Sequence, residues 1–325
     1  MSPAPAAARR PGEVLLAGVA GHFGRDVERS LTKAEAVCAS AAEAGVSLLA
    51  LPDATVGGYV DDLVDPLRSG DLPPAVDVDG PEVARLAAAA GDVVLCFGIA
   101  ERAVEGGEEV RYNTAVCVHR GEVLGTHRKV HLPLGEFQAY RAGDRFAAVD
   151  TPVGRVGLLV DFDKSFPESG RALALDGAEV LVCLSAWPAS ATDRAERLRL
   201  DRQARLFDIY DAARAAENQV WLVSANQTGR QGRLHFLGQA KVVDPSGDVV
   251  ARTWSQGGMA SAVADVSGGV AQARRRVHHL RDRVLGAYGD RVGQPYDDGS
   301  TPAVAARPRA VAGPSSPGRW PSASR

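Results

Sequence analysis

The sequence predicts an α/β protein in which helices cover a sheet. Short apolar runs, typical of buried strands, alternate with stretches whose apolar residues recur at helical spacing, and this alternation continues through the first two thirds of the 325-residue chain. The chain is long enough to bury a full core. Its hydrophobic content of 45% and charged content of 24% are typical of globular proteins. We find no linker and no internal repeat, so we expect one domain.

The first half of the chain begins with a strand, a helix and a second strand. Residues 14–19 form a short apolar run. Thr32, with Glu35 three residues later, predicts the start of a helix through a capping box, and Gly45 predicts its end. The apolar run 46–51 predicts a buried strand. The next expected elements are a helix at 81–90, a strand at 92–99, and a hairpin of 112–119 with 122–127.

The second half continues the alternation and ends in a hairpin. We expect strands at 155–160, 178–184 and 219–225, with helices at 166–176 and 191–217. Strands at 237–243 and 249–252 are joined by the Pro/Ser/Gly-containing turn 244–248. We expect a domain at 13–290, because residues 1–12 and the C-terminal segment 291–325 lack periodicity and suit disordered tails.

Composition excludes several classes of function. A formal net charge of −3 gives no electrostatic reason to expect nucleic acid or an acidic membrane surface as a partner. No apolar run approaches the roughly 20 residues of a membrane helix, and the N-terminus lacks the apolar core of a signal peptide. We therefore expect a cytoplasmic protein. The four cysteines lack metal-type spacing, so we expect buried, inert thiols and neither a metal nor a cofactor: Cys38, Cys96, Cys117 and Cys183.

Four collinear segments carry the most specific pattern in the chain. One is Gly157-Leu-Leu-Val-Asp-Phe-Asp-Lys-Ser-Phe-Pro-Glu168, and another is the strand that ends in Pro52-Asp53 and continues to Gly58-Tyr59. The third joins Tyr112-Asn113 to Arg128-Lys129-Val-His131, with Glu136 and Gly143 following, and the fourth begins at Asn226-Gln-Thr-Gly229. In order and spacing, these segments resemble the nitrilase (carbon–nitrogen hydrolase) superfamily across about residues 13–290.

The resemblance implies a fold and a catalytic apparatus. The fold is a four-layer α-β-β-α sandwich that dimerises through helices into an αββα–αββα assembly. In the family, a glutamate takes the proton of a cysteine thiol, the thiolate attacks an amide or nitrile carbon, and a lysine stabilises the developing anion. Lys129 matches that lysine, whereas Asp53 stands at the position of the base and Asp161 at that of the nucleophile. The resemblance also makes Glu136, Tyr59, Phe162 and Trp187 candidate substrate-binding residues.

The two aspartates change the chemistry that this pattern implies. A carboxylate is a weak nucleophile toward an amide, and the anhydride that it would form is higher in energy than a thioester. Because Asp161 has no thiol, we do not expect ordinary thiol-dependent hydrolysis. Asp53, Glu136 and Asp161 would surround the single cation of Lys129, and two like charges at ~4 Å cost on the order of 4 kcal/mol at an effective dielectric constant near 20. One carboxyl must stay protonated, or a cationic small molecule must enter. A metal is less favoured, because only His131 offers an imidazole nearby.

Two classes of function remain open. The chain is either an atypical enzyme that uses Asp/Lys acid–base or carboxylate chemistry on a small amine-, amide- or nitrile-like molecule, or a catalytically inactive homologue that binds a ligand or partner as a dimer. An inactivated variant is a third alternative. Purely structural roles also stay open for these residues. Lys129 could lie on the surface, Asp53 in a turn, and Glu136 in a solvated loop. Asp161 could merely neutralise Lys129, and Trp187 could be a core residue.

Overall fold

The computed structural model describes residues 9–68, 70–289 and 292. The chain divides into two compact units between Arg283 and Val284. The first unit contains the sheet and the long helices, and in the second the described residues form the short helix α6 (Leu285–Tyr288). Of the predicted tails, 1–12 and 291–325, only residues 9–12 and 292 lie within the described part of the chain.

A large mixed sheet organises the first unit. In the described part it has twelve strands, whose main order is β5-β4-β3-β2-β1-β9-β8-β7-β6, with β14 added to β1 and β12 added to β9, followed by β13. The pairs from β3 through β2, β1, β9 and β8 to β7 are all parallel, and the additions are antiparallel. The strands are β1 (Glu13–Gly21), β2 (Leu48–Ala50), β3 (Val94–Glu105), β4 (Glu108–His119), β5 (Glu122–Arg128), β6 (Ala148–Thr151), β7 (Gly154–Val160), β8 (Val180–Ser185), β9 (Trp221–Gln227), β12 (Lys241–Val243), β13 (Val249–Arg252) and β14 (Gly258–Asp265), with a separate ribbon of β10 (Arg230–Gln231) and β11 (Leu234–His235).

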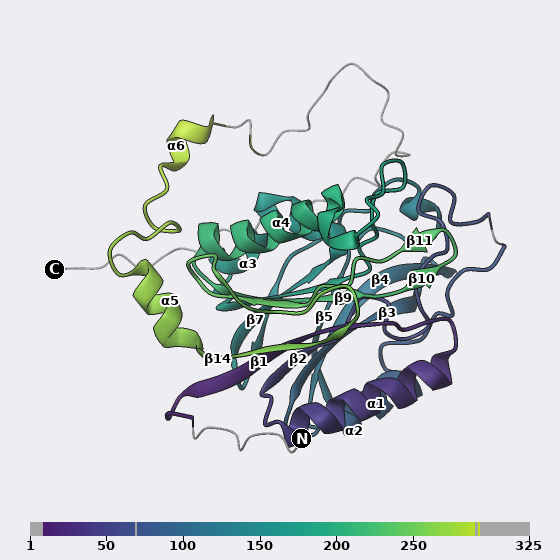
Figure 1. Cartoon of the computed structure of the whole chain (residues 1–325), viewed down its shortest axis with the longest axis horizontal. Coiled ribbons are helices and arrows are strands. Elements are labelled where there is room, and N and C mark those ends of the chain that lie inside the picture. The colour runs from purple at the N-terminus through teal and green to yellow at the C-terminus, as the bar shows by residue number, and fades with distance from the viewer. Residues whose placement is uncertain (1–8, 69, 290–291, 293–325) are drawn as a thin grey trace. The chain divides into compact units, whose positions relative to one another are not determined.

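Helices cover the sheet on both outer sides. Helices α1 and α2 lie on one side of the strands, and α3 and α4 lie on the opposite side (Figure 1). The helices are α1 (Val27–Glu43), α2 (Pro81–Ala90), α3 (Pro167–Leu175), α4 (Arg202–Asn218) and α5 (Val266–Arg274), and the short 3-10 turns are η1 (Glu136–Gln138), η2 (Asp161–Ser165) and η3 (Leu198–Leu200). The predicted α/β class is confirmed.

The buried clusters show that the sheet folds into two packed layers. One cluster joins side chains of β2, β3 and β4, such as Leu48 and Val94, to side chains of β7 and β8, such as Val156 and Val182. These two groups of strands are far apart in the sheet order, so their side chains can meet only if the two halves of the sheet face each other. Separate clusters lie beneath α1 and α2 and beneath α3 and α4. The layers are therefore helix, sheet, sheet and helix, as the resemblance implied.

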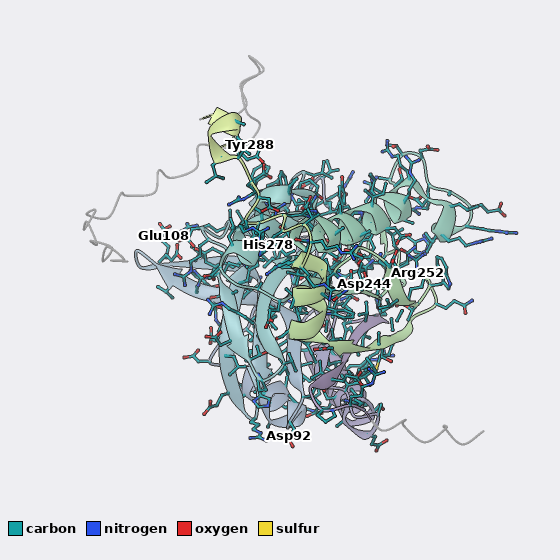
Figure 2. All side chains as sticks on the ribbon, turned by 90° about the vertical axis from the view of Figure 1, so that its left-hand side faces the viewer. Asp92, Glu108, Asp244, Arg252, His278 and Tyr288 are labelled. Atoms are coloured by element: carbon teal, nitrogen blue, oxygen red, sulfur yellow. The ribbon has the colours of Figure 1, made fainter. Side chains whose placement is uncertain are left out.

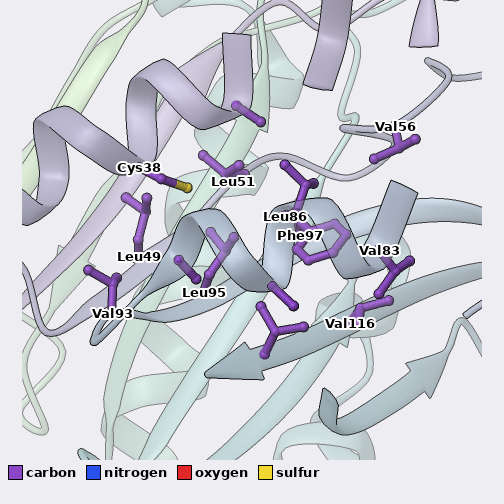
Figure 3. Packing of buried hydrophobic residues seen from close by; sticks show 14 of the residues in the cluster. Cys38, Leu49, Leu51, Val56, Val83, Leu86, Val93, Leu95, Phe97 and Val116 are labelled. Carbon is purple, nitrogen blue, oxygen red and sulfur yellow. The ribbon is translucent and has the colours of Figure 1, made fainter. Parts of the chain in front are cut away.

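The outer cluster beneath α1 and α2 is densely apolar (Figure 3). Cys38 of α1 and Leu86 of α2 point toward Leu49, Leu95 and Phe97 of the sheet, and all five are at most 1% exposed. Burying an aliphatic or aromatic side chain of this size contributes about 1.5–3 kcal/mol. All four cysteines are free, and their predicted burial is confirmed.

The predicted start of the first helix is wrong. Helix α1 begins at Val27, and the side chain of its N-cap residue, Asp26, accepts the backbone N–H of Arg29 at 3.0 Å. Thr32 lies within the helix. Aspartate caps as well as threonine does, so the earlier cap decides where the helix begins.

The predicted start of the long fourth helix is also wrong. Helix α4 begins at Arg202 rather than near residue 191, because Asp201 caps it by accepting the N–H of Gln203. The carboxylate of Asp201 also accepts the N–H groups of Ser190 and Ala195 and so holds the preceding segment in a loop.

The hairpins were predicted in part. The pairing of β4 with β5 is confirmed. A longer hairpin joins β3 to β4, and Figure 2 shows Glu108 at its tip. The sequence did not predict this hairpin, because charged and partly exposed residues in its outer half interrupt the apolar run. Strands β6 and β14 and helix α5 were not predicted.

The described residues include no helix that is both long enough and apolar enough to cross a membrane.

Candidate active site

Asp53 lies just beyond the carboxyl end of strand β2. It is fully buried, and its backbone carbonyl accepts a hydrogen bond at 2.8 Å from the side chain of Gln227, at the end of β9. Strand β3 approaches so closely that a Cβ atom at Gly98 would lie 2.5 Å from the nitrogen of Ala54. The carboxyl ends of parallel strands are the usual place for binding sites in α/β proteins, and Asp53 is fixed there by two neighbouring strands.

Lys129 follows β5 and is also fully buried. Its N–H donates to the carbonyl of Asn113 at 2.8 Å, and its carbonyl accepts from Gly143 at 2.8 Å. A Cβ atom at Gly143 would lie 2.2 Å from the carbonyl oxygen of Arg128, so only glycine fits this approach. The spacing of Lys129 and Gly143 in the sequence therefore has a structural cause.

Asp161 begins the 3-10 turn η2 directly after β7. Its backbone has φ +49°, a left-handed conformation that costs a non-glycine residue roughly 1–2 kcal/mol. Of the six non-glycine residues with positive φ in the described part, three belong to or adjoin this region: Ala54, Leu134 and Asp161. Strained backbone concentrates at functional sites. The conformation thus marks the site independently of any sequence pattern.

The ammonium group of Lys129 is surrounded by oxygen atoms. Its Nζ lies 2.7 Å from Glu136 Oε2, 3.2 Å from Asp161 Oδ2 and 3.4 Å from the hydroxyl of Tyr59. That hydroxyl donates to Glu136 Oε1 at 2.6 Å. All three protons of the ammonium group therefore have an acceptor.

Asp53 joins the cluster through Asn113, a residue that we had not assigned to the site. Asn113 Nδ2 donates to Asp53 Oδ2 at 2.9 Å and lies 3.4 Å from Glu136 Oε1. Three buried side-chain oxygens of this cluster have no hydrogen-bond partner: Asp53 Oδ1, Asn113 Oδ1 and Asp161 Oδ1. An unpaired buried polar atom costs about 1–3 kcal/mol, so these acceptors are suited to a ligand that carries N–H or O–H donors.

Burial and the shared lysine set the protonation of the cluster. Burial raises the pKa of Asp53 from 3.8 to about 7, although Lys129 opposes the rise. Burial also raises the pKa of Glu136, against the attraction of Lys129. Burial alone would lower the pKa of Lys129, but the carboxylates of Glu136 and Asp161 outweigh it, so its pKa is raised and the lysine stays charged. Near neutral pH, Asp53 is therefore divided between its acid and carboxylate forms.

Asp163 connects the Asp161 turn to the Lys129 segment. It accepts hydrogen bonds from His127 Nε2 at 2.9 Å and from His131 Nδ1 at 2.8 Å, which lie two residues before and two residues after Lys129. Burial alone would raise the pKa of Asp163, but these hydrogen bonds outweigh it and hold the pKa well below its usual range. The Asp163 carboxylate thus fixes the position of Lys129 relative to Asp161. The sequence segments that carry the resemblance contain Asp163 and His131, but this linking role was not predicted.

Three of the four buried thiols lie in environments that disfavour a replacement nucleophile. Burial raises the pKa of Cys183 to about 12 and that of Cys38 to about 11, and the pKa of Cys96 is also raised well above its usual value, mainly through its hydrogen bond with Cys117 and burial. A thiol reacts as its thiolate, which these environments disfavour.

Phe162 and Trp187 lie in an aromatic cluster next to the site. Their ring centroids are 6.3 Å apart, and Trp187 makes an edge contact with Phe207 at 5.8 Å. The backbone N–H of Trp187 donates to Asn226 Oδ1 at 2.8 Å. Trp187 is 6% exposed and packs as a core residue. Contact of Phe162 or Trp187 with a substrate stays a prediction.

A second buried charge cluster lies behind these aromatic rings. Lys164 Nζ lies 2.7 Å from Asp211 Oδ1, and Lys241 Nζ lies 2.8 Å from both Asp211 Oδ2 and Asp208 Oδ1. Both ammonium groups also contact the ring of Phe207, whose centroid lies 3.0 Å from Lys164 Nζ and 4.0 Å from Lys241 Nζ. Because Lys164 belongs to η2, the cluster attaches the Asp161 turn to α4.

Two cavities lie away from the acid–lysine cluster. One, of about 280 Å³, lies beside the start of α4 at Asp201 and Arg205. The other, of about 500 Å³, lies between α1 and the end of β1, with His22 and Lys33 in its wall. In the described residues, no group of three or more histidine, cysteine, aspartate or glutamate side chains is arranged to hold a metal ion.

Fold and site together define a class: a layered α/β protein with a buried lysine among carboxylates at strand ends. Residues 16–276 match the family model for Carbon-nitrogen hydrolase. The chain is 30% identical over 288 residues to an (R)-stereoselective amidase from Pseudomonas sp, covering 87% of this chain and 94% of that relative. The chain therefore belongs to the carbon–nitrogen hydrolase family, and the predicted superfamily is confirmed.

Two further comparisons agree with this assignment. The chain is 31% identical over 159 residues to the probable nitrilase C965.09 of Schizosaccharomyces pombe, covering 49% of this chain and 54% of the relative, so that match spans about half of the relative's length. A solved amidase from Nesterenkonia sp. AN1, with the acetamide moiety of fluoroacetamide added covalently at its active-site cysteine, superposes with a TM-score of 0.68 at 24% identity, covering 87% of this chain and 98% of the amidase. At this identity the likeness shows the fold alone. That Asp161 stands at a nucleophile position, and Asp53 at that of a base, stays a prediction.

Proposed function

We propose that this chain is an atypical carbon–nitrogen hydrolase that acts on a small amine-, amide- or nitrile-like molecule through Asp53, Lys129 and Asp161 rather than through a thiol. The observation that carries the proposal is the set of unpartnered buried acceptors, Asp53 Oδ1, Asn113 Oδ1 and Asp161 Oδ1, beside a lysine whose protons are all engaged. Such a site has unpartnered side-chain acceptors and excess negative charge, and a cationic ligand with N–H groups complements both.

The charge of the cluster favours a cationic ligand. By formal charge, the carboxylates of Glu136 and Asp161 outnumber the single ammonium of Lys129 even when Asp53 is protonated. Charge-assisted hydrogen bonds are roughly twice as strong as neutral ones, most of all where water is excluded. A bound cation neutralises the excess and gives the free oxygens partners.

Each residue then has a role. Asp53 is the general acid or base, since a pKa of about 7 suits proton transfer near neutral pH. Asp161 holds the cationic part of the ligand through Oδ1, and Lys129 holds Asp161 in place through Oδ2. Glu136 and Tyr59 orient Lys129, and Phe162 and Trp187 supply apolar surface near the ligand.

Calorimetric titration tests the binding part of the proposal. We expect ethylammonium to bind wild type more tightly than ethanol, its neutral analogue of similar size. Replacing Asp161 by asparagine removes the charge but keeps the shape. We expect that variant to lose ethylammonium affinity by about ten- to a hundredfold, since a hydrogen bond to a charged group contributes about 1.5–3 kcal/mol. Asp77→Asn, at an exposed ion pair, is the matched control. Equal or absent binding of the two ligands contradicts the proposal.

Mass spectrometry tests the catalytic part. Wild type, Asp161→Ala and Asp161→Cys are each incubated with amides, nitriles, carbamoyl compounds and amines. Turnover by wild type that disappears in Asp161→Ala supports carboxylate-based catalysis. Silence of wild type together with activity of Asp161→Cys supports a pocket that lacks only its nucleophile.

The second candidate is a catalytically inactive homologue that binds a ligand or partner as a dimer. The observation in its favour is the buried ion pair of Asp161 with Lys129, at 3.2 Å, which neutralises the lysine without any reaction. Dimerisation through helices belongs to this proposal as well as to the first. Light scattering after size-exclusion chromatography tests it, and a monomeric mass contradicts it.

A further inference from the structure

The cluster offers acceptors where an amide-hydrolysing site needs donors. Addition to an amide or nitrile builds negative charge on oxygen or nitrogen, which preorganised donors must stabilise. The three protons of Lys129 are directed at Glu136, Asp161 and Tyr59. The buried side-chain atoms of the cluster that have no partner are oxygens of Asp53, Asn113 and Asp161, all of which can accept hydrogen bonds.

We propose that the site hydrolyses a small amidinium group, with water as the nucleophile and Asp53 as the proton carrier. This inference rests on the proposed function and names the substrate class and the reaction of the same site. An amidinium is a planar cation with several N–H donors, which carboxylate oxygens bind through charge-assisted hydrogen bonds. It matches both the charge and the free acceptors of the cluster.

Hydrolysis can proceed without a thiol because the carbon of an amidinium is a stronger electrophile than the carbon of an amide. The carbon of an amidinium already carries positive charge, so addition of water yields a neutral tetrahedral intermediate rather than an oxyanion. No further donor is needed, and the engaged ammonium of Lys129 is no obstacle. The adjacent carboxylates bind the cationic reactant, and they stabilise the positive charge that returns to the intermediate when its nitrogen is protonated before ammonia leaves.

The steps balance with water as the only co-reactant. The Asp53 carboxylate accepts a proton from water while the water oxygen bonds to the amidinium carbon, and the C=N π electrons move onto nitrogen. Asp53 then returns the proton to one nitrogen, and the C–N bond breaks with its electron pair leaving on ammonia. The hydroxyl oxygen forms the carbonyl, and the departing ammonia takes the hydroxyl proton. Amidinium and water thus become amide and ammonium.

The burial pattern gives the direction of approach. The side chain of Asp161 is 6% exposed, whereas those of Lys129 and Glu136 are fully buried, as is Asp53. The substrate therefore meets Asp161 first, and Asp53, held by Asn113 on its other oxygen, lies deeper. Asp161 binds the cation, and Asp53 exchanges the proton.

Three probes separate this inference from the proposed function. Acetamidinium has the charge and the electrophilic carbon, acetamide is its neutral analogue, and ethylammonium has the charge alone. Binding is measured by calorimetry and ammonia release by a coupled enzymatic assay, with acetamide formation followed by NMR. We expect wild type and Asp77→Asn to release ammonia from acetamidinium at least tenfold faster than from acetamide. We expect Asp53→Asn to be slower by about a hundredfold or more, the usual contribution of a general base.

The pH profile of wild type provides a readout that does not depend on a variant. As Asp53 becomes protonated below its pKa of about 7, kcat/KM for acetamidinium should fall tenfold per pH unit. Binding of acetamidinium and ethylammonium without ammonia release overturns this inference and leaves the proposed function standing. Failure of both cations to bind overturns both. Ammonia release that is equally fast from acetamide, or unchanged in Asp53→Asn, also overturns the inference.

Discussion

Replacing Asp53 by asparagine should stabilise the folded protein, and the gain should grow with pH. Burial raises the pKa of Asp53 from 3.8 to about 7 in the folded state, a difference of about 3 units. Between these two values the unfolded chain has released the proton and the folded chain still holds it. Stability therefore falls as the pH rises through this window and stays reduced above it. At 1.36 kcal/mol per unit, the penalty that asparagine removes is about 4 kcal/mol.

The substitution keeps the local hydrogen bonds. The amide oxygen of asparagine can still accept from Asn113 Nδ2, and its NH2 group takes the place of the unpartnered Asp53 Oδ1. Urea unfolding followed by tryptophan fluorescence, at about pH 4, 6 and 8, measures the difference. We expect similar stabilities near pH 4 and a more stable variant at pH 8, while the exposed-site control Asp77→Asn shows no such trend. Parallel pH profiles of variant and wild type, or a less stable variant at pH 8, would refute the reasoning.

Three further substitutions test the buried charges. Lys129→Met leaves buried carboxylates without their cation, so urea unfolding should show a loss of about 3–5 kcal/mol in the free energy of unfolding at pH 8. This loss should shrink toward pH 5 as the carboxyls take up protons. A loss that does not depend on pH contradicts this assignment. Asp163→Asn should cost about 2–4 kcal/mol at pH 7. Because the folded-state pKa of Asp163 is lowered, its contribution is present above about pH 4 and declines below that value, so the deficit should narrow at pH 3. Lys164→Met should lower the free energy of unfolding by about 3–5 kcal/mol, and adding Asp211→Leu should recover part of that loss. If the two residues act independently, the two losses add instead, which contradicts the assignment.

Much of the fold followed from local patterns. Helix α2 was predicted with its observed bounds, Pro81–Ala90, because proline at the helix start and glycine at its end are strong signals. The start of α4 was missed because Asp201 acts through backbone groups up to eleven residues away. Strand β14 was missed because its alternating pattern is mixed with half-buried positions. Long-range hydrogen bonds and partial burial are therefore difficult to predict from a single sequence.

The candidate site was predicted from collinear motifs. The structure brings Asp53, Tyr59, Lys129, Glu136 and Asp161 together, although they are spread over about a hundred residues. The role of Asn113 could not be read from the sequence, because it exists only where a β4 side chain meets the end of β2.

The buried cluster around Lys164 was also not predicted. Its lysines and aspartates look like surface charges in the sequence, and only the folded chain shows that they neutralise one another in the interior. Charge pairing across distant segments depends on tertiary structure.

The central claim is that a partly protonated cluster of carboxyl groups binds a cation and takes the place of thiol chemistry in this protein. Carbon-13 NMR of aspartate-labelled protein tests it most directly, with the Asp53 signal identified by its absence in Asp53→Asn. We expect the Asp53 carboxyl to titrate with a midpoint of about 7, and ethylammonium to shift that midpoint to lower pH, because a bound cation favours the carboxylate. A midpoint near the ordinary aspartate value of about 4, or one that the cation leaves unchanged, would contradict the claim.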